Sequence, residues 1–329
     1  MVVQPVAVDP RERLDFLRST RKTRWRMLDV RRLRALREVA DRGTIAAAAD
    51  ALVLTPSAVS QQLAALAREV GEPLVEPNGR SVHLTAAAHV LLEHADVLFA
   101  QIERLESDVL HYRGTPRGRV RVAAFATALA GIVAPAGVWL RKEAPELRLQ
   151  VIEAEAPDAF AALARREVDV VVAMVCEGAA AAADARFVRR DLGADLLDAV
   201  LPAGHPLAAQ DELALADLHD EDWVAPPAGW SCEQVVRASC AAAGFTPRVH
   251  HRSADWAATM ALVSAGFGVS LVPRLAQVRP PDGAMLRPLA APVPARHLFT
   301  ACRSGAEASL AIEATLDALV GSAPLRDDR

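Results

Sequence analysis

Residues 44–70, TIAAAADALVLTPSAVSQQLAALAREV, constrain the fold more than any other stretch, because they read as two short helices joined by a tight turn. Apolar residues recur at helical spacing in the second helix and predict one buried stripe. The stripe consists of Val59, Leu63, Leu66 and Val70. Thr55 is a good N-cap, and Pro56 suits the first helical position, where a missing N–H costs nothing. The second helix is therefore expected to begin at Pro56.

Polar side chains occupy the opposite face of this helix. Ser57, Ser60 and Gln61 face away from the stripe, and short hydroxyls and amides hydrogen-bond phosphates or base edges in a major groove. An ordinary helical hairpin with solvated polar residues is the alternative. The flanks favour DNA binding, because residues 30–43 predict a preceding helix and residues 71–85 predict a short two-stranded wing. The buried face of the preceding helix is predicted to hold Leu33, Leu36, Val39 and Ala40.

Three segments, LRALREVADRGTIAAAADAL, TPSAVSQQLAALAREVGEPLVE and GRSVHLT, resemble the LysR-type transcriptional regulators, a bacterial family with an N-terminal winged helix-turn-helix. The resemblance implies binding to a double-stranded DNA operator. The DNA-binding residues that it implies are Thr44, Thr55, Pro56, Ser57, Ser60, Gln61 and Arg80. Val53 stands in the turn where the family usually has Gly, so a residue with a Cβ must tolerate that backbone.

Composition places the chain among globular proteins. It has 329 residues, 52% of them hydrophobic, which suffices for two or three domains. The net charge of −4 gives no general attraction to nucleic acid or acidic membranes. Four cysteines without a CxxC pair predict free thiols in a reducing cytoplasm, and no secretion signal opens the chain. Residues 122–140 lack charge, but their Ala, Gly and Pro content predicts a buried strand and helix instead of a membrane span.

The segment after the wing is predicted to be a dimerising helix. Residues 86–112 contain no Gly or Pro and keep four heptads of apolar residues, which favours a coiled-coil seam over a long helix packed on its own domain. The residues assigned to the dimer are Leu91, Ala95, Leu98, Ile102, Leu105 and Val109. Residues 1–26 are basic and read as a solvated extension; a phosphate-contacting arm is the alternative.

Beyond residues 113–118, which break the helix, strands alternate with helices. The predicted strands are 119–125, 148–153, 168–175, 196–201, 248–252, 269–272 and 296–303. The predicted helices are 127–142, 158–166, 232–243, 255–265 and 306–320. Alternation of this kind predicts parallel βαβ units in two doubly wound α/β subdomains.

RVRVAAF, EAPELRLQV, REVDVVVAMV, AVLPAGHPLA and ALVSAGFGVSLVP are similar to the effector-binding domain of the same family, which is like periplasmic solute-binding proteins. The fold class is thus α/β with an N-terminal α winged helix-turn-helix and a long linker helix. The expected domains are an extension (1–26), a DNA-binding domain (27–85), a linker helix (86–113), a first effector subdomain (118–195 with 296–323) and a second (196–295).

Ligands of open α/β sheets bind outside the carboxyl ends of strands, near helix N-termini, where hydroxyls suit a carboxylate or another small anion. The candidate effector-binding residues are Phe125, Ala126, Thr127, Trp230, Ser231, Ser253, Gly266 and Phe267. Each has an alternative role, since Ser231 with Gln234 fits a capping box and Trp residues usually pack in a core.

The sequence gives little support for a catalytic function. No G-x-S-x-G, phosphate loop or zinc-type His spacing is present, so we expect no catalytic residues, metal or cofactor. Cys232 and Cys240 invite a redox interpretation, because peroxide-sensing members of the family use two cysteines in this region. Cys240 matches one of these two positions, but Ser231, and not Cys232, stands at the other. Eight residues along one helix also separate two thiols by about 12 Å, too far for a disulfide.

The predicted function is a cytoplasmic, sequence-specific LysR-type regulator controlled by a small effector between the α/β subdomains. The resemblance implies a homodimer or homotetramer, contact with RNA polymerase and no membrane. A cytosolic solute-binding module with a degenerate DNA-binding domain is the alternative. An enzyme on this fold would need a catalytic constellation that the sequence does not contain.

Overall fold

The computed structural model describes residues 28–78, 81–111, 114–175, 184–276 and 279–324. The predicted extension 1–26 and Arg80 lie outside these residues. The chain divides into two compact units, residues 1–95 and 96–329, and the boundary falls inside the linker helix instead of at its ends. No helix within the described ranges is long and apolar enough to cross a membrane.

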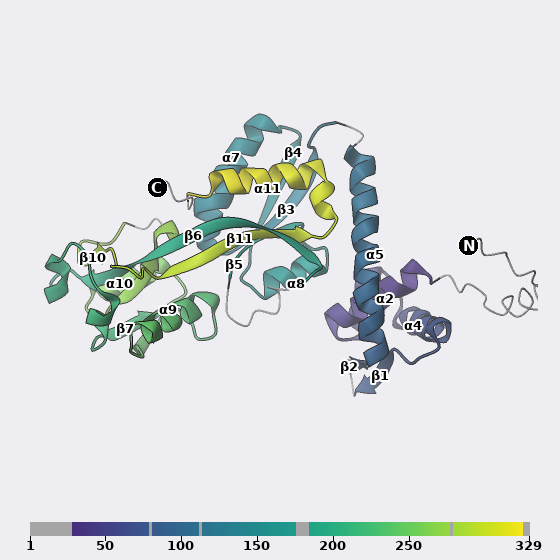
Figure 1. Ribbon diagram of the computed structural model, residues 1–329, viewed down its shortest axis with the longest axis horizontal. Coiled ribbons are helices and arrows are strands. Elements are labelled where there is room, and N and C mark those ends of the chain that lie inside the picture. The colour runs from purple at the N-terminus through teal and green to yellow at the C-terminus, as the bar shows by residue number, and fades with distance from the viewer. Residues whose placement is uncertain (1–27, 79–80, 112–113, 176–183, 277–278, 325–329) are drawn as a thin grey trace, which may run out of the picture. The chain divides into compact units, whose positions relative to one another are not determined.

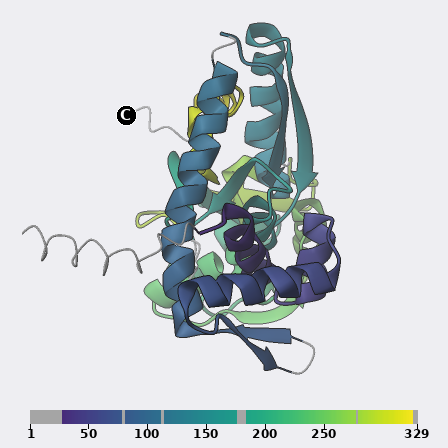
Figure 2. The ribbon, with the colours of Figure 1, turned by 90° about the vertical axis from the view of Figure 1, so that its right-hand side faces the viewer.

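The first unit is a winged helix-turn-helix. Its elements are α2 (Val30–Arg42), α3 (Ile45–Leu52), α4 (Pro56–Val70), β1 (Val75–Asn78), β2 (Ser81–Leu84) and the start of α5 (Ala86–His111). The predicted buried faces of α2 and α4 are confirmed for Leu33, Leu36, Val39, Val59, Leu63 and Leu66. Val70 is an exception and is exposed, because it is the last residue of α4 before the Gly71 cap. Strands β1 and β2 pair antiparallel as the predicted wing (Figure 2).

The turn between α3 and α4 has an unusual backbone. Val53 caps α3 in the left-handed conformation, with φ 55° and ψ 44°, and its N–H bonds back to the last turn of α3. A β-branched residue in this region is strained by about 1–2 kcal/mol, whereas Gly adopts it freely. The side chain is 91% exposed, so packing inside the chain returns none of this cost.

The second unit contains two α/β subdomains. The first subdomain comprises β3 (Gly118–Ala124), α6 (Ala126–Ala128), a π-helical turn (Leu129–Val133), α7 (Ala134–Glu143), β4 (Leu147–Glu153), α8 (Asp158–Ala164), β5 (Val170–Met174) and α11 (Leu310–Ser322). The second comprises β7 (Asp222–Ala225), α9 (Ser231–Ala242), β8 (Arg248–Arg252), α10 (Trp256–Ser264), β9 (Ser270–Pro273) and β10 (Ala284–Arg287). Strands β3, β4 and β5 pair in parallel, as do β7 and β8, which confirms the predicted βαβ units.

Two long strands pass through both subdomains. β6 (Phe187–Pro202) pairs antiparallel with β11 (Ala295–Arg303), and they run side by side from the α7 and α11 layer toward α9 and α10 (Figure 1). The strand predicted at 196–201 covers only the end of β6, and β7 and β10 were not predicted. Charged residues in 187–195 hide the strand pattern, because Arg189, Arg190 and Asp191 break the apolar run. The sheet order is β10-β6-β11-β5-β3-β4, with β9 also on β6.

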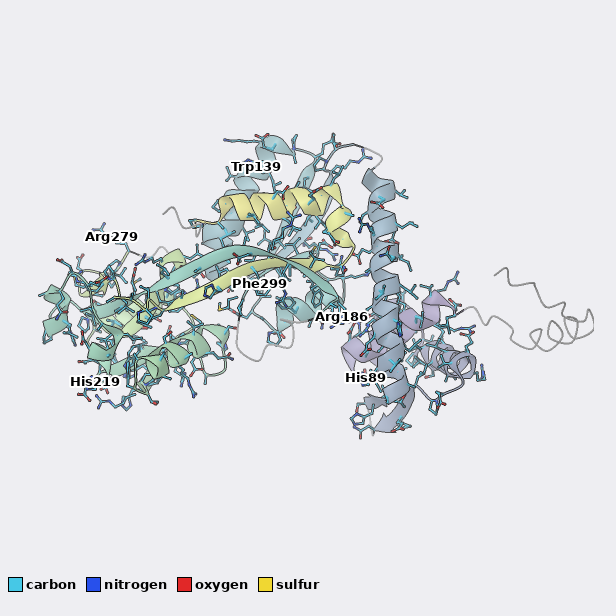
Figure 3. The ribbon with its side chains drawn as sticks, in the orientation of Figure 1. His89, Trp139, Arg186, His219, Arg279 and Phe299 are labelled. Carbon is cyan, nitrogen blue, oxygen red and sulfur yellow. The ribbon has the colours of Figure 1, made fainter. Side chains whose placement is uncertain are left out.

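Apolar clusters cover the faces of this sheet. One cluster lies between the sheet and α7 and α11, and includes Ile132, Leu140 and Leu316. Another lies under α8 and includes Phe160, Phe187 and Phe299, of which Phe299 is marked in Figure 3. The helix predicted at 127–142 contains a π turn, in which a Cβ on Gly131 would lie 2.3 Å from Cδ1 of Leu275. Gly131 therefore lets this helix pack closely against Leu275, in the turn that follows β9 of the second subdomain.

Candidate nucleic-acid interface and ligand cleft

The start of α4 forms as the sequence predicts. The Thr55 hydroxyl accepts a hydrogen bond from the Ala58 N–H at 3.2 Å, and Pro56 is the first helical residue. Thr44 caps α3 in the same way through the Ala47 N–H. Thr44 and Thr55 therefore act first as helix caps, and their hydroxyls can only offer a remaining hydrogen to a phosphate.

An unbroken run of exposed residues, 53–57, leads into the polar face of α4. Ser57, Ser60 and Gln61 are all exposed on this face, as predicted. Ser60 donates to the Pro56 carbonyl at 2.9 Å, and the Ser57 and Thr55 hydroxyls share a hydrogen bond at 3.3 Å, which leaves Gln61 with the freest side chain. An exposed amide on the first two turns of a helix-turn-helix recognition helix has the reach and the donor–acceptor pair that a base edge requires.

The linker helix α5 exposes part of its apolar seam. Leu98, Leu105 and Val109 are exposed, while Leu91 and Ile102 are half-buried. The assignment of Ala95 to the dimer is wrong, because this residue is buried within its own unit. The exposed residues Val90 and Val97 lie about 100° around the helix from Leu91 and Leu98, so the exposed apolar surface of α5 extends beyond a strict heptad seam.

A second exposed apolar surface lies on the first effector subdomain. Val138 and Trp139 project from α7 (Trp139 is marked in Figure 3), and Val151 is exposed on β4. Strand β4 is an edge of the sheet, so one side of its backbone has no strand partner among the described residues.

A buried ion pair lies where the two subdomains meet. Arg296, at the start of β11, donates to the Asp195 carboxylate from Nε at 2.8 Å and from Nη2 at 2.6 Å. Arg296 is 2% exposed and Asp195 is fully buried. Nη2 also donates to the Thr127 hydroxyl at 2.7 Å, and the guanidinium lies 5.1 Å from the centre of the Phe125 ring. Phe125 and Thr127 therefore do lie together at the end of β3, as predicted.

Asp195 also joins the two subdomains at their crossover. Its second oxygen accepts the Leu275 N–H at 2.9 Å. Leu275 follows β9 of the second subdomain and packs on Gly131 of the first. The pair thus fixes the backbone at the point where the chain passes between subdomains.

The N-terminus of α9 faces this pair. Trp230 is the N-cap and makes no side-chain capping bond, so the capping box predicted as the alternative role of Ser231 is absent. The first N–H groups of α9 therefore remain available beside Ser231, which is half-exposed. Trp230 is exposed, as is Ala126 at the end of β3.

Ser253 ends β8 on the same sheet edge, because its N–H bonds to the Ala225 carbonyl at the end of β7. Its hydroxyl is used in the turn that precedes α10. The structure places Gly266 and Phe267 elsewhere. They precede β9, and the next residue, Gly268, lies against Asp222 at the start of β7, so they occupy the opposite edge. Phe267 packs there on His251.

Burial keeps the cysteines of this region as thiols. Burial raises the pKa of Cys232 to about 11, although the charge of Arg296 and a hydrogen bond from it lower the value. Burial raises the pKa of Cys240 to about 12. Neither thiol is a thiolate at neutral pH, and only the thiolate is a strong nucleophile. The redox interpretation therefore gains nothing from the structure.

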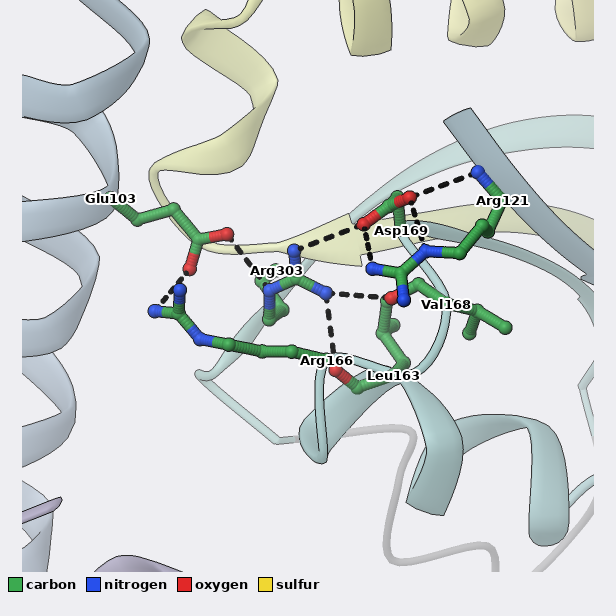
Figure 4. A network of polar contacts seen from close by, with 7 residues as sticks. All are labelled: Glu103, Arg121, Leu163, Arg166, Val168, Asp169 and Arg303. Carbon is green, nitrogen blue, oxygen red and sulfur yellow. Dashed lines mark hydrogen bonds and ion pairs between the residues drawn. The ribbon is translucent and has the colours of Figure 1, made fainter. Parts of the chain in front are cut away.

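A polar network anchors the second half of α5 to the first effector subdomain (Figure 4). Glu103 accepts hydrogen bonds from Arg303 at 2.8 Å and from Arg166 at 3.0 Å. Arg303 also donates to the carbonyls of Leu163 and Val168, and its Nη2 lies 3.6 Å from Asp169. The contact is close, because a Cβ on Gly305 would lie 2.1 Å from the Ala100 carbonyl oxygen of α5.

Asp169 connects this network to Arg121 of β3. Its carboxylate accepts the backbone N–H of Arg121 at 2.9 Å and two bonds from the guanidinium. Burial alone would raise the pKa of Asp169, but these bonds and the charge of Arg303 outweigh it and hold the pKa below its usual value.

Sequence patterns missed Arg296 and Asp195. They lie 101 residues apart, on two strands that pair only in the folded chain. The one available signal is a charged residue at the start of the apolar strand ARHLFTAC, where a buried position calls for a partner. Nothing in the local pattern identifies that partner.

Similarity to known proteins agrees with this architecture. Residues 30–89 match the family described as bacterial regulatory helix-turn-helix protein, lysR family, and residues 113–324 match the LysR substrate binding domain. The transcriptional dual regulator GltC of Bacillus subtilis is 30% identical over 247 residues, covering 75% of this chain and 81% of that protein. The small neutral protease regulatory protein of Streptomyces coelicolor is 30% identical over 307 residues, covering 88% and 87%.

Solved structures share the fold. A full-length OxyR variant from Pseudomonas aeruginosa superposes with a TM-score of 0.67 at 19% identity, covering 92% of this chain and 99% of that one. Full-length CbnR in complex with its target DNA superposes with a TM-score of 0.54 at 21% identity, covering 90% and 99%.

Proposed function

This chain belongs to the LysR family of DNA-binding transcriptional regulators, and we propose that α4 reads its operator while a small molecule in the cleft controls the outcome. The observation that carries the DNA proposal is the exposed run 53–57, which continues into the polar face of α4. Gln61 and Ser57 contact base edges in the major groove. Thr44, Thr55 and Pro56 lie along the phosphates, with Arg80 of the wing as a further phosphate contact.

Dimerisation through α5 brings two recognition helices to one operator. Burying Val97, Leu98, Leu105 and Val109 against the same residues of a second copy removes apolar surface from water. A two-fold dimer then reads two half-sites on one face of the DNA. The exposed surface of Val138, Trp139 and Val151 supplies a second contact between copies, as a tetramer requires.

The cleft is proposed to bind a small carboxylate. The uncapped N-terminus of α9 and the Ser231 hydroxyl offer donors to an anion, and the Thr127 hydroxyl retains its own hydrogen for donation. Phe125 and Trp230 supply apolar surface for the rest of the ligand. Binding favours one arrangement of the subdomains, which changes how the dimers are held and how the operator is bent. We place this activity in the cytoplasm, with RNA polymerase as the further partner.

Binding to the intergenic DNA upstream of the protein's own gene tests the DNA proposal. Gln61→Ala and Ser57→Ala are compared with Gln150→Ala, an exposed amide on β4 of the effector subdomain. We expect specific, salt-sensitive binding by the unaltered protein, about a ten-fold loss for Gln61→Ala, and no change for Gln150→Ala. Equal binding by all three variants would remove α4 from the interface.

A further inference from the structure

Glu155 is a half-buried carboxylate at the carboxyl edge of the first subdomain's parallel strands. It lies in the loop between β4 and α8, just beyond the carboxyl end of β4, the edge at which Phe125 and Thr127 follow β3. Within the described ranges its carboxylate accepts no hydrogen bond and forms no ion pair, although its backbone carbonyl accepts the Ala159 N–H. It interacts electrostatically with Arg296 and with Cys232 of α9, so both subdomains contribute to its surroundings.

Arg296 does not neutralise this carboxylate. Both of its bonds to Asp195 are short, and a third goes to Thr127, so its charge is already matched inside the pair. Cys232 is an uncharged thiol because burial raises its pKa to about 11. Glu153, at the end of β4, adds a further negative charge at the rim. Among the described residues that interact with Glu155, the charge of Arg296 is matched by Asp195, so the carboxylates of Glu155 and Glu153 remain as two unmatched negative charges.

The surroundings of Glu155 disfavour its charged form. Burial raises the pKa of Glu155 above its ordinary value, Arg296 opposes the shift, and Glu153 adds to it. A half-buried carboxylate is costly without donors, and an ammonium group supplies three of them together with the opposite charge. The cleft is thus better suited to a ligand with a cationic nitrogen than to a simple anion.

We propose that Glu155 binds a positively charged nitrogen of the effector, which makes the effector an amino-bearing carboxylate such as an amino acid. This inference rests on the proposed function and deepens it. The ligand's carboxylate lies at the N-terminus of α9 and Thr127, and its ammonium group lies on Glu155. A ligand of this kind contributes no net charge of its own but matches the uneven charge distribution of the cleft.

Ligand binding to the full-length chain tests the proposal. The probes are the standard amino acids, each paired with the carboxylic acid of the same skeleton that lacks the amine. Thermal unfolding serves as the screen, and calorimetry measures Kd for each compound that raises Tm. We expect at least one amino acid to bind at least ten-fold more tightly than its deaminated partner, because a charge-assisted hydrogen bond is lost with the amine.

Glu155→Gln identifies the residue, and Glu146→Gln is the matched control, since it removes an exposed carboxylate just before the opposite end of β4. Glu155→Gln should weaken the amino acid by about ten-fold or more and leave the deaminated acid unchanged. Glu146→Gln should bind both as before. In the unaltered protein the affinity for the amino acid should fall as the pH drops through the Glu155 pKa, and this dependence should be absent in Glu155→Gln.

Three results would overturn the proposal: equal binding of the amino acid and its deaminated partner, full retention of affinity in Glu155→Gln, or no amino acid that raises Tm at millimolar concentration. Operator binding, measured on the same preparations, separates this failure from that of the proposed function. If operator binding persists, the regulator stands and only the ligand class is wrong. Glu155→Gln must also unfold cooperatively, and we expect its Tm without ligand to rise, because an unmatched charge is removed.

Discussion

Each end of β11 carries an arginine that pairs with a carboxylate, but the two pairs differ in burial and in the number of their partners. Arg296 at one end has Asp195 as its one ion-pair partner among the described residues, and the two side chains are 2% and 0% exposed. Arg303 at the other end shares Glu103 with Arg166 and lies near Asp169, with side-chain exposures of 11–15% for itself and the two carboxylates. The first end lies where the two subdomains meet, and the second holds the linker helix.

The difference shows how burial sets what an ion pair is worth. A fully buried pair gains little over apolar packing, yet loss of one partner leaves a charge that nothing solvates. A network at the edge shares each charge among several donors, so loss of one member is partly made good by its neighbours and by water. Substitutions at the two ends should therefore differ in size.

Arg296→Met should have the largest effect. It leaves Asp195 buried and uncompensated, which costs about 3–5 kcal/mol of the free energy of unfolding. Urea denaturation of the full chain measures the loss. The double variant Arg296→Met with Asp195→Asn should recover much of it, and a double variant as unstable as the single one would show that the charge is not the cause.

Glu103→Gln should cost less, about 1–3 kcal/mol, because one amide group replaces a carboxylate that accepts from two guanidinium groups. Glu106→Gln on the same helix is the control, since Glu106 is exposed. Denaturation should separate the two variants. Equal stability of both would mean that the network does not anchor α5.

The Asp169 end of the network should make stability depend on acid. Its pKa is lower in the folded chain than in the unfolded one, so its contribution is present above the unfolded pKa and is lost as the pH falls through the folded value. Asp169→Asn should remove about 1 kcal/mol at neutral pH and flatten this part of the profile. Unchanged acid dependence in the variant would contradict the assignment.

The ion pair between β6 and α11, which is more exposed, should contribute least to the free energy of unfolding. Arg190 of β6 binds Asp317 of α11 at 2.5 Å, but the Asp317 side chain is 61% exposed. Asp317→Asn should change the free energy of unfolding by about 0–1 kcal/mol, and salt should reduce even that. A loss as large as that of Glu103→Gln would show that burial does not set the order.

The two cysteines beside Arg296 and Arg303 should react only slowly with alkylating reagents in the native chain. Burial raises the pKa of Cys232, beside Arg296, to about 11 and that of Cys302, beside Arg303, to about 12. In a Cys176→Ser background, alkylation of the native chain at neutral pH should be slow and should become fast in denaturant. Rapid labelling of either thiol without denaturant would contradict its burial.

Local features were predictable and distant ones were not. Thr55, Pro56 and the stripe of Val59, Leu63 and Leu66 follow from spacing within one helix, and the structure confirms them. The cleft pair depends on strands that meet only after folding, so no spacing in the chain reveals it. Phe267 differs, because in a parallel βαβ unit a loop that leads from a helix into a strand lies at the amino ends of the strands, so its position between α10 and β9 already argued against the ligand edge.

The left-handed turn at Val53 also has a genetic consequence. Every valine codon becomes a glycine codon by exchange of its middle base alone, so the residue that fits this turn without strain lies a single mutation away. The helix-turn-helix of this chain therefore carries a reserve of stability that one mutation would release. A destabilised descendant of this protein could be rescued at this position, far from the original defect.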